Sequence, residues 1–315
     1  MSRIASTIIL TFQEEAHIER AIASASAISA QTFVVDSFST DKTVELAQGL
    51  GAQVVQHPFV TQALQFQWAL DNLPVEAEWV MRLDADETLT PELVEEVGRR
   101  LPELPPEVAG VNLKRRHIFL GRWIKHGGRY PLTLLRIWRK GAARIEQRWM
   151  DEHMVLLRGR VVTFEYDFCD HNLHDLTFFT DKHNKYATRE AIDVLMRRYG
   201  LGDVDETLTR ESASRQAAAK RWIKENFYNR LPFWLGPLGY FVYRYFIQLG
   251  FLDGREGLIY QFLQGFWYRF LVGAKVLEFD RALKPLADAD ADADVRLAAL
   301  ARLTGYALAD LQRDP

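Results

Sequence analysis

The chain has 315 residues and a formal net charge of −3, with 48% hydrophobic and 26% charged residues. This ordinary globular composition excludes a disordered or collagen-like chain. The single cysteine, Cys169, excludes an internal disulfide framework and a cysteine-based zinc ribbon. The near-neutral charge argues against a nucleic-acid partner. The first residues show no signal-peptide pattern, so a cytoplasmic location is expected.

Strands and helices are predicted to alternate over the first hundred residues. Four apolar, β-branched runs predict buried strands, at residues 7–11, 32–35, 53–56 and 79–83. Helix-forming segments follow the first three strands, and Thr90-Pro91 begins a fourth helix. This order is typical of a parallel α/β sheet. Short β-like runs within residues 110–165 predict a mixed extension of the sheet, and residues 175–199 and 205–226 are expected to be helical.

Polar and acidic residues follow three of these strands, at residues 11–15, 36–41 and 84–87. Ligands of open α/β sheets bind beyond the carboxyl ends of the strands, so these segments are expected to share one site. No GxGxxG, P-loop or GxSxG motif is present, which excludes a typical NAD site, a P-loop and a nucleophile elbow. The oxygen ligands of Asp84 and Asp86 suit Mg²⁺ or Mn²⁺ bridging a diphosphate.

The same segments resemble a known family. They read Thr-Phe-Gln-Glu-Glu at 11–15, Val-Asp-Ser-Phe-Ser-Thr-Asp at 35–41 and Leu-Asp-Ala-Asp-Glu at 83–87. In this order and spacing they look like the nucleotide-binding half of family 2 glycosyltransferases. Further segments resemble the subgroup that builds bacterial lipopolysaccharide core and other envelope glycans: residues 130–137, 148–153, 175–186 and 251–254. The resemblance covers about residues 4–282. It implies a GT-A fold, a Rossmann-like, mixed but mainly parallel sheet flanked by helices.

The resemblance also implies roles for the residues that would bind the nucleotide-sugar donor. Thr11 and Asp36 would hold the nucleobase, and Phe12 would belong to the same nucleotide site. Glu14 would lie near the ribose. Asp84 would contact the ribose or metal-bound water. The first donor to expect is a UDP-sugar.

The metal and the catalytic base are implied in the same way. Asp86 would bind the divalent ion, Mg²⁺ or Mn²⁺. Glu152 or Asp151 would deprotonate the acceptor hydroxyl, and the choice between them stays open. His153 could orient this base. Contacts with the diphosphate or the acceptor are expected from four cations: Arg82, Arg129, Lys182 and Arg189.

Three positions depart from the family pattern. The family usually has Asn where Gln13 stands and His where Asp151 stands. It usually has Gly at the position of Phe38, so either the turn there is not left-handed or the ring packs near the base. His171 and His174 are spaced like zinc ligands, but with no clear third ligand a structural or acceptor-binding role is expected.

The C-terminal part is unusually aromatic and basic. Residues 222–279 contain 18 of the 38 aromatic residues, and residues 210–284 carry 12 Lys or Arg against 6 Asp or Glu. Its uncharged runs, at residues 231–243 and 257–268, are shorter than the ~20 residues that a spanning helix needs. Aromatic rings interleaved with cations are typical of helices at a membrane interface. An aromatic cap or a dimer contact is the alternative.

The expected organisation has three parts. Residues 1–210 would form the catalytic domain, residues 211–284 an amphipathic membrane-interface region, and residues 285–315 an Ala/Asp-rich tail, solvated or weakly helical. The whole would be an inverting enzyme on the cytoplasmic face of the inner membrane, adding one sugar to a lipid-linked envelope glycan. Processive polymerases carry Gln-x-x-Arg-Trp, whereas four residues separate Gln216 from Arg221 here. A nucleotidyltransferase and a non-catalytic envelope scaffold are the alternatives.

Overall fold

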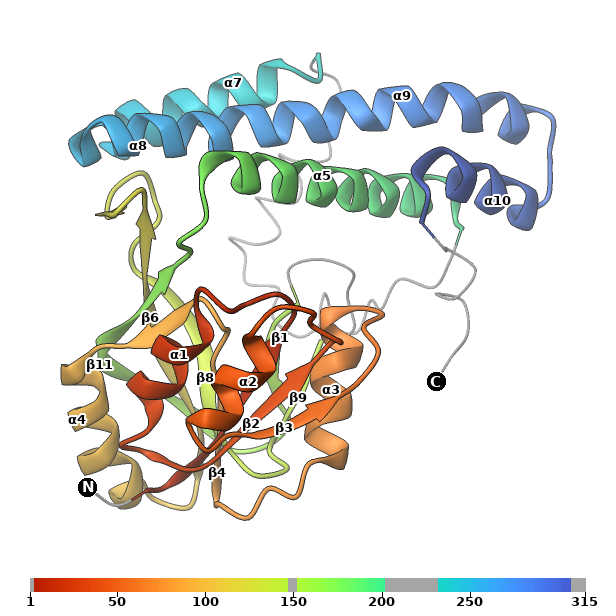
Figure 1. Ribbon diagram of the computed structural model, residues 1–315. Helices are drawn as coiled ribbons and strands as arrows, with labels where there is room; N and C mark the ends of the chain where they lie inside the picture. Colours follow the sequence, from red (N-terminus) through yellow and green to blue (C-terminus); the bar gives the residue numbers. More distant parts are fainter. Residues whose placement is uncertain (1–2, 147–151, 202–231, 307–315) are drawn as a thin grey trace. The chain divides into compact units, whose positions relative to one another are not determined.

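The computed structural model of the protein describes residues 3–146, 152–201 and 232–306 (Figure 1). The chain forms two compact units. The first comprises Met1–His174 and Gln248–Gly257, and the second comprises Asp175–Ile247 and Leu258–Pro315. The units therefore divide after residue 174, not near residue 210 as the sequence suggested.

The first unit begins with the predicted alternation of strands and helices. Its strands are β1 (Ala5–Thr11), β2 (Ser29–Asp36), β3 (Gln53–Gln56) and β4 (Trp79–Arg82). The helices between them are α1 (Ile18–Ala25), α2 (Thr43–Gly49) and α3 (Gln62–Asn72). The four strands are parallel in the order β3-β2-β1-β4. Three of their carboxyl ends are therefore neighbours.

Further strands extend the sheet beyond β4. They are β5 (Glu87–Leu89), β6 (Val108–Phe119), β7 (Arg122–Trp123), β8 (Leu132–Arg139) and β11 (Arg160–His171). In the described part of the chain the sheet has nine strands, ordered β3-β2-β1-β4-β8-β6-β11-β5 with β7 on β6. β8 is antiparallel to β4 and β6, whereas β11 is parallel to β6. A separate hairpin contains β9 (Ala143–Ile145) and β10 (Met154–Leu156).

Burial on both faces explains why β1 is almost continuously apolar. Successive side chains of a strand point to opposite faces. Ile9 packs in one core cluster with Ile18 of α1, and Ile8 packs in another with Phe66 of α3. Such a strand cannot show alternating polarity, and this confirms the prediction of a buried strand. The predicted α/β class with a helical C-terminal region is likewise confirmed.

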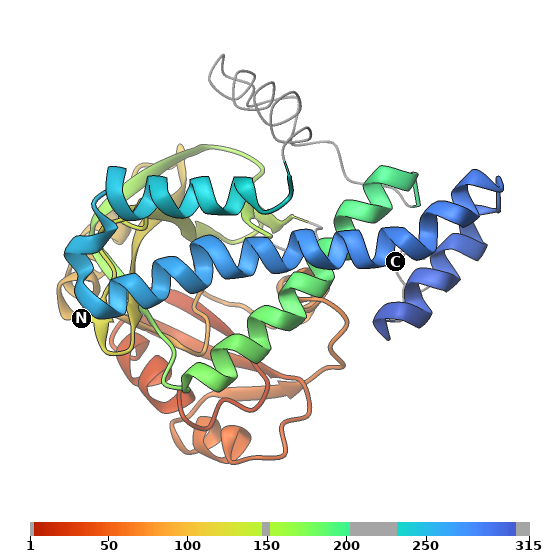
Figure 2. The same cartoon turned by 90° about the horizontal axis from the view of Figure 1, so that it is seen from above.

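The second unit is helical. It contains α5 (Leu176–Tyr199), α7 (Leu235–Val242), α9 (Tyr268–Asp288) and α10 (Ala293–Thr304). α7 and α9 run side by side, as Figures 1 and 2 show. Tyr199 on α5 donates to Asp280 on α9 at 2.7 Å, and Tyr268 donates to Glu190 at 2.6 Å. These contacts explain why α5 belongs to the helical unit.

Two expectations for the C-terminal part can be compared with the structure. The Ala/Asp-rich tract separates α9 from α10, and α10 buries Leu297 and Leu300, so this part of the tail is a packed helix and not a solvated segment. Among the described residues, no helix is both long and apolar enough to cross a membrane. The helix expected at residues 205–226 and the segment around Gln216 lie outside the described residues.

Candidate active site

The carboxyl ends of β1, β2 and β4 bring the three polar segments to one edge of the sheet. Thr11 and Asp36 are paired in the register of β1 and β2. β4 pairs with the other side of β1 and leads directly into Asp84. The convergence expected from the strand ends is therefore present.

Asp36 is fully buried, and its carboxylate organises the loop after β2. Its Oδ1 accepts from Thr11 Oγ1 at 3.1 Å and from Ser39 Oγ at 2.5 Å. Its Oδ2 accepts from Ser39 N at 2.9 Å and from Gln56 Nε2 at 3.3 Å. The loop backbone is left-handed at Phe38, with φ 60°, so this turn exists without a glycine. The ring of Phe12 on the neighbouring loop is 59% exposed.

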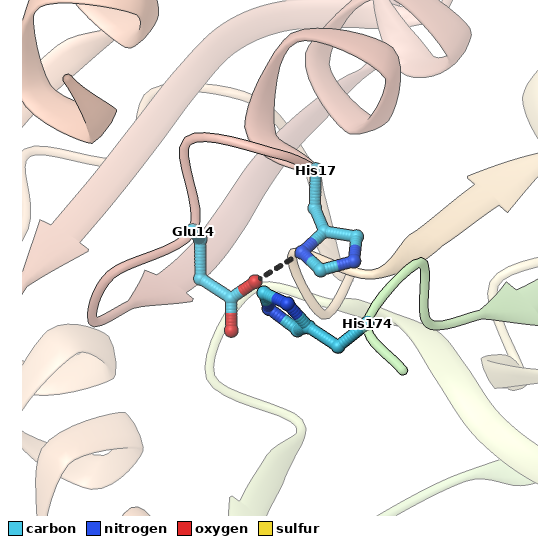
Figure 3. A group of neighbouring side chains, drawn as sticks. All are labelled: Glu14, His17 and His174. Atoms are coloured by element: carbon cyan, nitrogen blue, oxygen red, sulfur yellow. Dashed lines mark hydrogen bonds and ion pairs between the residues drawn. The ribbon is translucent and has the colours of Figure 1, made fainter. Parts of the chain in front are cut away.

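Glu14, His17 and His174 form a cluster beside this edge (Figure 3). His17 is fully buried, and its Nε2 accepts from Leu173 N at 2.9 Å. The neutral ring then carries its proton on Nδ1, which lies 2.7 Å from Glu14 Oε2. The three side chains could hold a metal ion, but both nitrogens of His17 already have partners. The arrangement instead ties the loop after β1 to the end of β11.

Asp84 lies in a network of charges that the sequence did not reveal. Arg82 Nε donates to Asp84 Oδ1 at 3.0 Å, and Arg136 Nη2 reaches Asp84 Oδ2 at 3.4 Å. Burial acts to raise the pKa of Asp84, but these two guanidiniums outweigh it and hold that pKa well below its usual range. Arg136 also donates to Glu87 Oε1 at 2.5 Å. Burial, with the nearby Asp84 charge, raises the pKa of Glu87 to about 8, because the two carboxylates compete for one guanidinium.

Asp86 is the carboxylate at this edge that best fits a divalent cation. Its Oδ2 accepts from Asn172 Nδ2 at 3.1 Å, and its backbone oxygen accepts from His171 N at 3.0 Å. Both oxygens of Asp84, in contrast, are engaged by guanidiniums. Mg²⁺ is commonly held by one or two carboxylates together with substrate phosphates. Asp86 alone supplies such a ligand here, as the resemblance implied.

Glu152, the candidate base, lies at the same edge, and its side chain is 10% exposed. Its Oε1 is 3.8 Å from Arg82 Nη2. The carboxamide of Gln62, at the start of α3, lies between them: its oxygen accepts from Arg82 at 2.6 Å and its nitrogen donates to Glu152 at 3.3 Å. The nearest acidic partner of the His153 ring is Glu146, at 3.9 Å. Asp151 lies outside the described residues.

The four expected cations have different surroundings. Arg82 is 7% exposed, lies over the Phe66 ring and is held by carboxylates of its own chain. Arg129 belongs to the first unit, where its charge lowers the pKa of Asp170. Lys182 and Arg189 belong to the helical unit. Lys182 lies near the rings of Phe178 and Tyr186, and Arg189 lies over the ring of Tyr306.

Two residues of the site were not assigned a role from the sequence. Arg136 stands within a segment that carries the resemblance, but an arginine inside a strand pattern does not announce a buried ion pair. Gln62 begins a helix and gives no signal of its own. Both were recognisable only through their contacts with Asp84 and Glu152.

Comparisons with known proteins agree with this geometry. Residues 6–161 match the family model described as glycosyl transferase family 2. This part of the chain is therefore a family 2 glycosyltransferase domain, and it contains β1–β4 and the Asp84–Asp86 segment.

More specific likenesses cover less of the chain. Uncharacterized glycosyltransferases of Rickettsia bellii, Rickettsia typhi and Rickettsia prowazekii are 44% identical to it over 92 residues. That stretch is 29% of this chain and 31% of each relative, so the match spans about a third of their length. Glucosyl-3-phosphoglycerate synthase from Mycobacterium tuberculosis, solved with Mn²⁺, UDP and glucosyl-3-phosphoglycerate, is 25% identical over 37% of this chain and 44% of that one, with a TM-score of 0.31.

Proposed function

We propose that the protein is an inverting, metal-dependent glycosyltransferase that moves one sugar from a nucleotide sugar to a lipid-linked glycan in bacterial envelope polysaccharide or lipopolysaccharide synthesis. A UDP-sugar is the first donor to test. The family 2 domain supports the reaction class. The observation that carries the proposal is the meeting of Asp84 and Glu152 on Arg82, because it places a donor-side carboxylate and a candidate base at one edge of the sheet.

The proposed reaction uses Glu152 as a general base. Its carboxylate accepts the proton of an acceptor hydroxyl, and that oxygen forms a bond to the anomeric carbon of the donor sugar. The bond from this carbon to the diphosphate oxygen breaks, and attack from the opposite face inverts the configuration. The leaving nucleoside diphosphate keeps the electron pair. A divalent ion held by Asp86 would supply positive charge to this diphosphate.

In this proposal Arg82 positions other residues. It was expected to contact the diphosphate, but its guanidinium is buried and engaged with Asp84, Gln62 and Glu152. Its fixed charge keeps Glu152 ionised and oriented, as a base requires. Contact with the diphosphate then falls to the metal at Asp86.

The helical unit supports the proposed contact with the cytoplasmic face of the inner membrane. Four exposed apolar side chains follow one another at intervals of four residues along α7 and the π-helical turn after it: Trp234, Leu238, Val242 and Phe246. This spacing keeps side chains near one face of a helix. A row of large apolar residues suits the headgroup zone of a bilayer. We call these four residues the α7 row.

One part of the membrane hypothesis needs correction. Arg244 was expected to meet anionic lipid, but it is 3% exposed and lies over the rings of Tyr240 and Tyr260. Replacing it would disturb the packing of the helical unit. Arg269 is exposed, although it also lies over the Tyr240 ring at 4.2 Å.

The reaction is tested with the full chain, Mn²⁺ and a panel of UDP-, GDP- and dTDP-sugars. Slow release of one nucleoside diphosphate without acceptor, reduced in Asp86→Ala and unchanged in Glu165→Gln, would support the proposal. Glu165 is an exposed glutamate on β11, away from the edge that carries Asp86, and serves as the matched control. Release of pyrophosphate from a nucleoside triphosphate and a sugar phosphate would instead indicate a nucleotidyltransferase. Donor binding with no turnover, even when glycan acceptors are supplied, would indicate a scaffold.

A further inference from the structure

The Asp36 carboxylate has no acceptor capacity left for a ligand. An ionised carboxylate offers about four lone-pair sites. Thr11, Ser39 and Gln56 fill them with four hydrogen bonds, and the residue has no exposed surface. Asp36 therefore holds the loops of β1 and β2 together. A base that sought a hydrogen bond from it would have to displace one of these donors.

The two loops are tied together in a second place. Gln13 N donates to Ser39 Oγ at 2.9 Å, and Gln13 Nε2 donates to Thr40 Oγ1 at 2.8 Å. Gln13 is itself left-handed, with φ 59°. Each loop therefore carries one non-glycine residue in a conformation that L-residues rarely adopt. The hydrogen bonds across the loops fix both turns before any ligand arrives.

Each of these turns presents an exposed phenylalanine. Phe12, directly before Gln13, is 59% exposed, and Phe38, itself the left-handed residue, is 52% exposed. A left-handed backbone is costly for a bulky side chain, and a ring that is half in solvent recovers little by packing. Strain that packing does not offset is typical of a residue kept for function. The two residues follow the register pair Thr11 and Asp36 on adjacent strands.

We propose that Phe12 and Phe38 form an aromatic clamp that holds the base of the donor nucleotide by stacking, while Asp36 builds the clamp and does not read the base. The proposal rests on the proposed function, which supplies the nucleotide. Stacking tolerates any base, since every base has a π-face. A site that recognises hydrogen-bonding groups rejects the wrong ligand far more strongly. UDP, dTDP, GDP and ADP should therefore bind within about tenfold of one another.

The experiment measures binding to the full chain by calorimetry in Mn²⁺, with the four nucleotides and with pyrophosphate, which has no base. Phe38→Gly should weaken binding of every nucleotide by about 5-fold to 100-fold. It should leave pyrophosphate binding unchanged, and Phe38→Tyr should stay close to wild type. Its melting temperature should be equal to or above that of the wild type, because glycine relaxes the φ of 60°.

Leu120→Gly is the matched control. Leu120 is also left-handed, with φ 49°, and is 46% exposed, but it stands on the turn between β6 and β7. Its replacement should affect the melting temperature in the same direction and leave all binding unchanged. A loss of nucleotide affinity in Phe38→Gly alone would thus report contact with the base and not relief of strain.

The contrary outcomes are distinct. If the wild type binds UDP and Phe38→Gly binds it equally well, the clamp is wrong and the donor site stands. If GDP and ADP bind at least 100-fold more weakly than UDP, the base is read by hydrogen bonds and the role given to Asp36 is wrong. If the wild type binds neither nucleotides nor pyrophosphate, the proposed function fails, and the clamp fails with it.

Discussion

Arg82 Nη2 lies 3.8 Å from Glu152 Oε1, and both side chains are nearly buried. The same guanidinium donates through Nε to Asp84. A single cation thus joins the strand end expected to meet the donor to the carboxylate expected to activate the acceptor. The distance between these two functions is set by one side chain, so a disturbance at either carboxylate should reach the other.

Replacing the candidate base should separate binding from turnover. Glu152→Gln should keep donor affinity and lower turnover by about 10²–10⁴, because the amide cannot accept the acceptor proton. Asp151→Asn should be milder. Both effects are measured as kcat and donor KM with a glycan acceptor, and Glu165→Gln again serves as the control. A larger effect at Asp151 would identify that residue as the base.

Removing the metal ligand should affect the leaving group. Asp86→Ala should lower transfer by about 10²–10³, as expected for loss of one electrostatic contact to developing charge. EDTA should inhibit the wild type, and added Mn²⁺ or Mg²⁺ should restore it. The contact of Asp86 with Asn172 provides a comparison, since Asn172→Ala should leave the metal ligand in place and cost less. Wild-type activity of Asp86→Ala in EDTA would contradict the metal role.

The buried Arg136 should matter chiefly for stability. Arg136→Met leaves Asp84 and Glu87 without a shared partner and should lower the free energy of unfolding by about 3–5 kcal/mol. Urea unfolding followed by circular dichroism measures it. The exposed pair of Arg160 and Glu107, at 3.6 Å, is the control, and Arg160→Gln should change stability by about 0–1 kcal/mol.

A double variant tests the cause of this effect. Glu87→Gln removes one of the two carboxylates that Arg136 serves, so adding it to Arg136→Met should recover part of the loss. An Arg136→Met effect no larger than that of Arg160→Gln would mean that the buried network does not stabilise the fold.

Asp170 should contribute to the acid sensitivity of the fold. Burial alone would raise its pKa, but the charges of His117 and Arg115 outweigh this and hold the pKa below its usual range. A carboxyl with a depressed folded pKa stabilises the protein above its unfolded pKa of about 3.9, and this contribution is lost as the pH falls through the folded pKa. The stability of Asp170→Asn should therefore fall less steeply below about pH 4.

Urea midpoints measured from pH 7 down to pH 3 check this prediction. Asp71→Asn serves as the control, because Asp71 is an exposed residue of α3 whose partner is Gln67 on the same helix. Parallel curves for Asp170→Asn and the wild type would contradict the assignment.

The α7 row should govern membrane contact. Leu238→Glu with Val242→Glu should weaken binding to anionic liposomes, because two carboxylates would enter the headgroup zone, and should leave UDP binding intact. Co-sedimentation measures the bound fraction. Leu303→Glu, at an exposed apolar position on α10, is the control. Equal binding of all three proteins, or no binding by the wild type, would count against the membrane proposal.

The sequence by itself determined the parallel half of the sheet and the edge where the site lies. Buried strands of β-branched residues are recognisable locally, and parallel strands must present their carboxyl ends together. Thr11, Asp36 and Asp84 could therefore be grouped without coordinates. The family resemblance added Glu152, which lies almost seventy residues beyond Asp84 and follows from no local pattern.

Tertiary structure alone decided what most of these side chains contact. Arg136 reaches Asp84 because β8 pairs with β4, and that register is set by the core over more than fifty residues of chain. The same holds for Arg82, which read as a surface cation and is buried, and for Arg244, whose neighbours are aromatic rings. Asp36 is the clearest case, since its four partners come from three separate segments. A sequence shows that a carboxylate stands at a strand end, but only the packing around it shows whether its oxygens are left for a ligand.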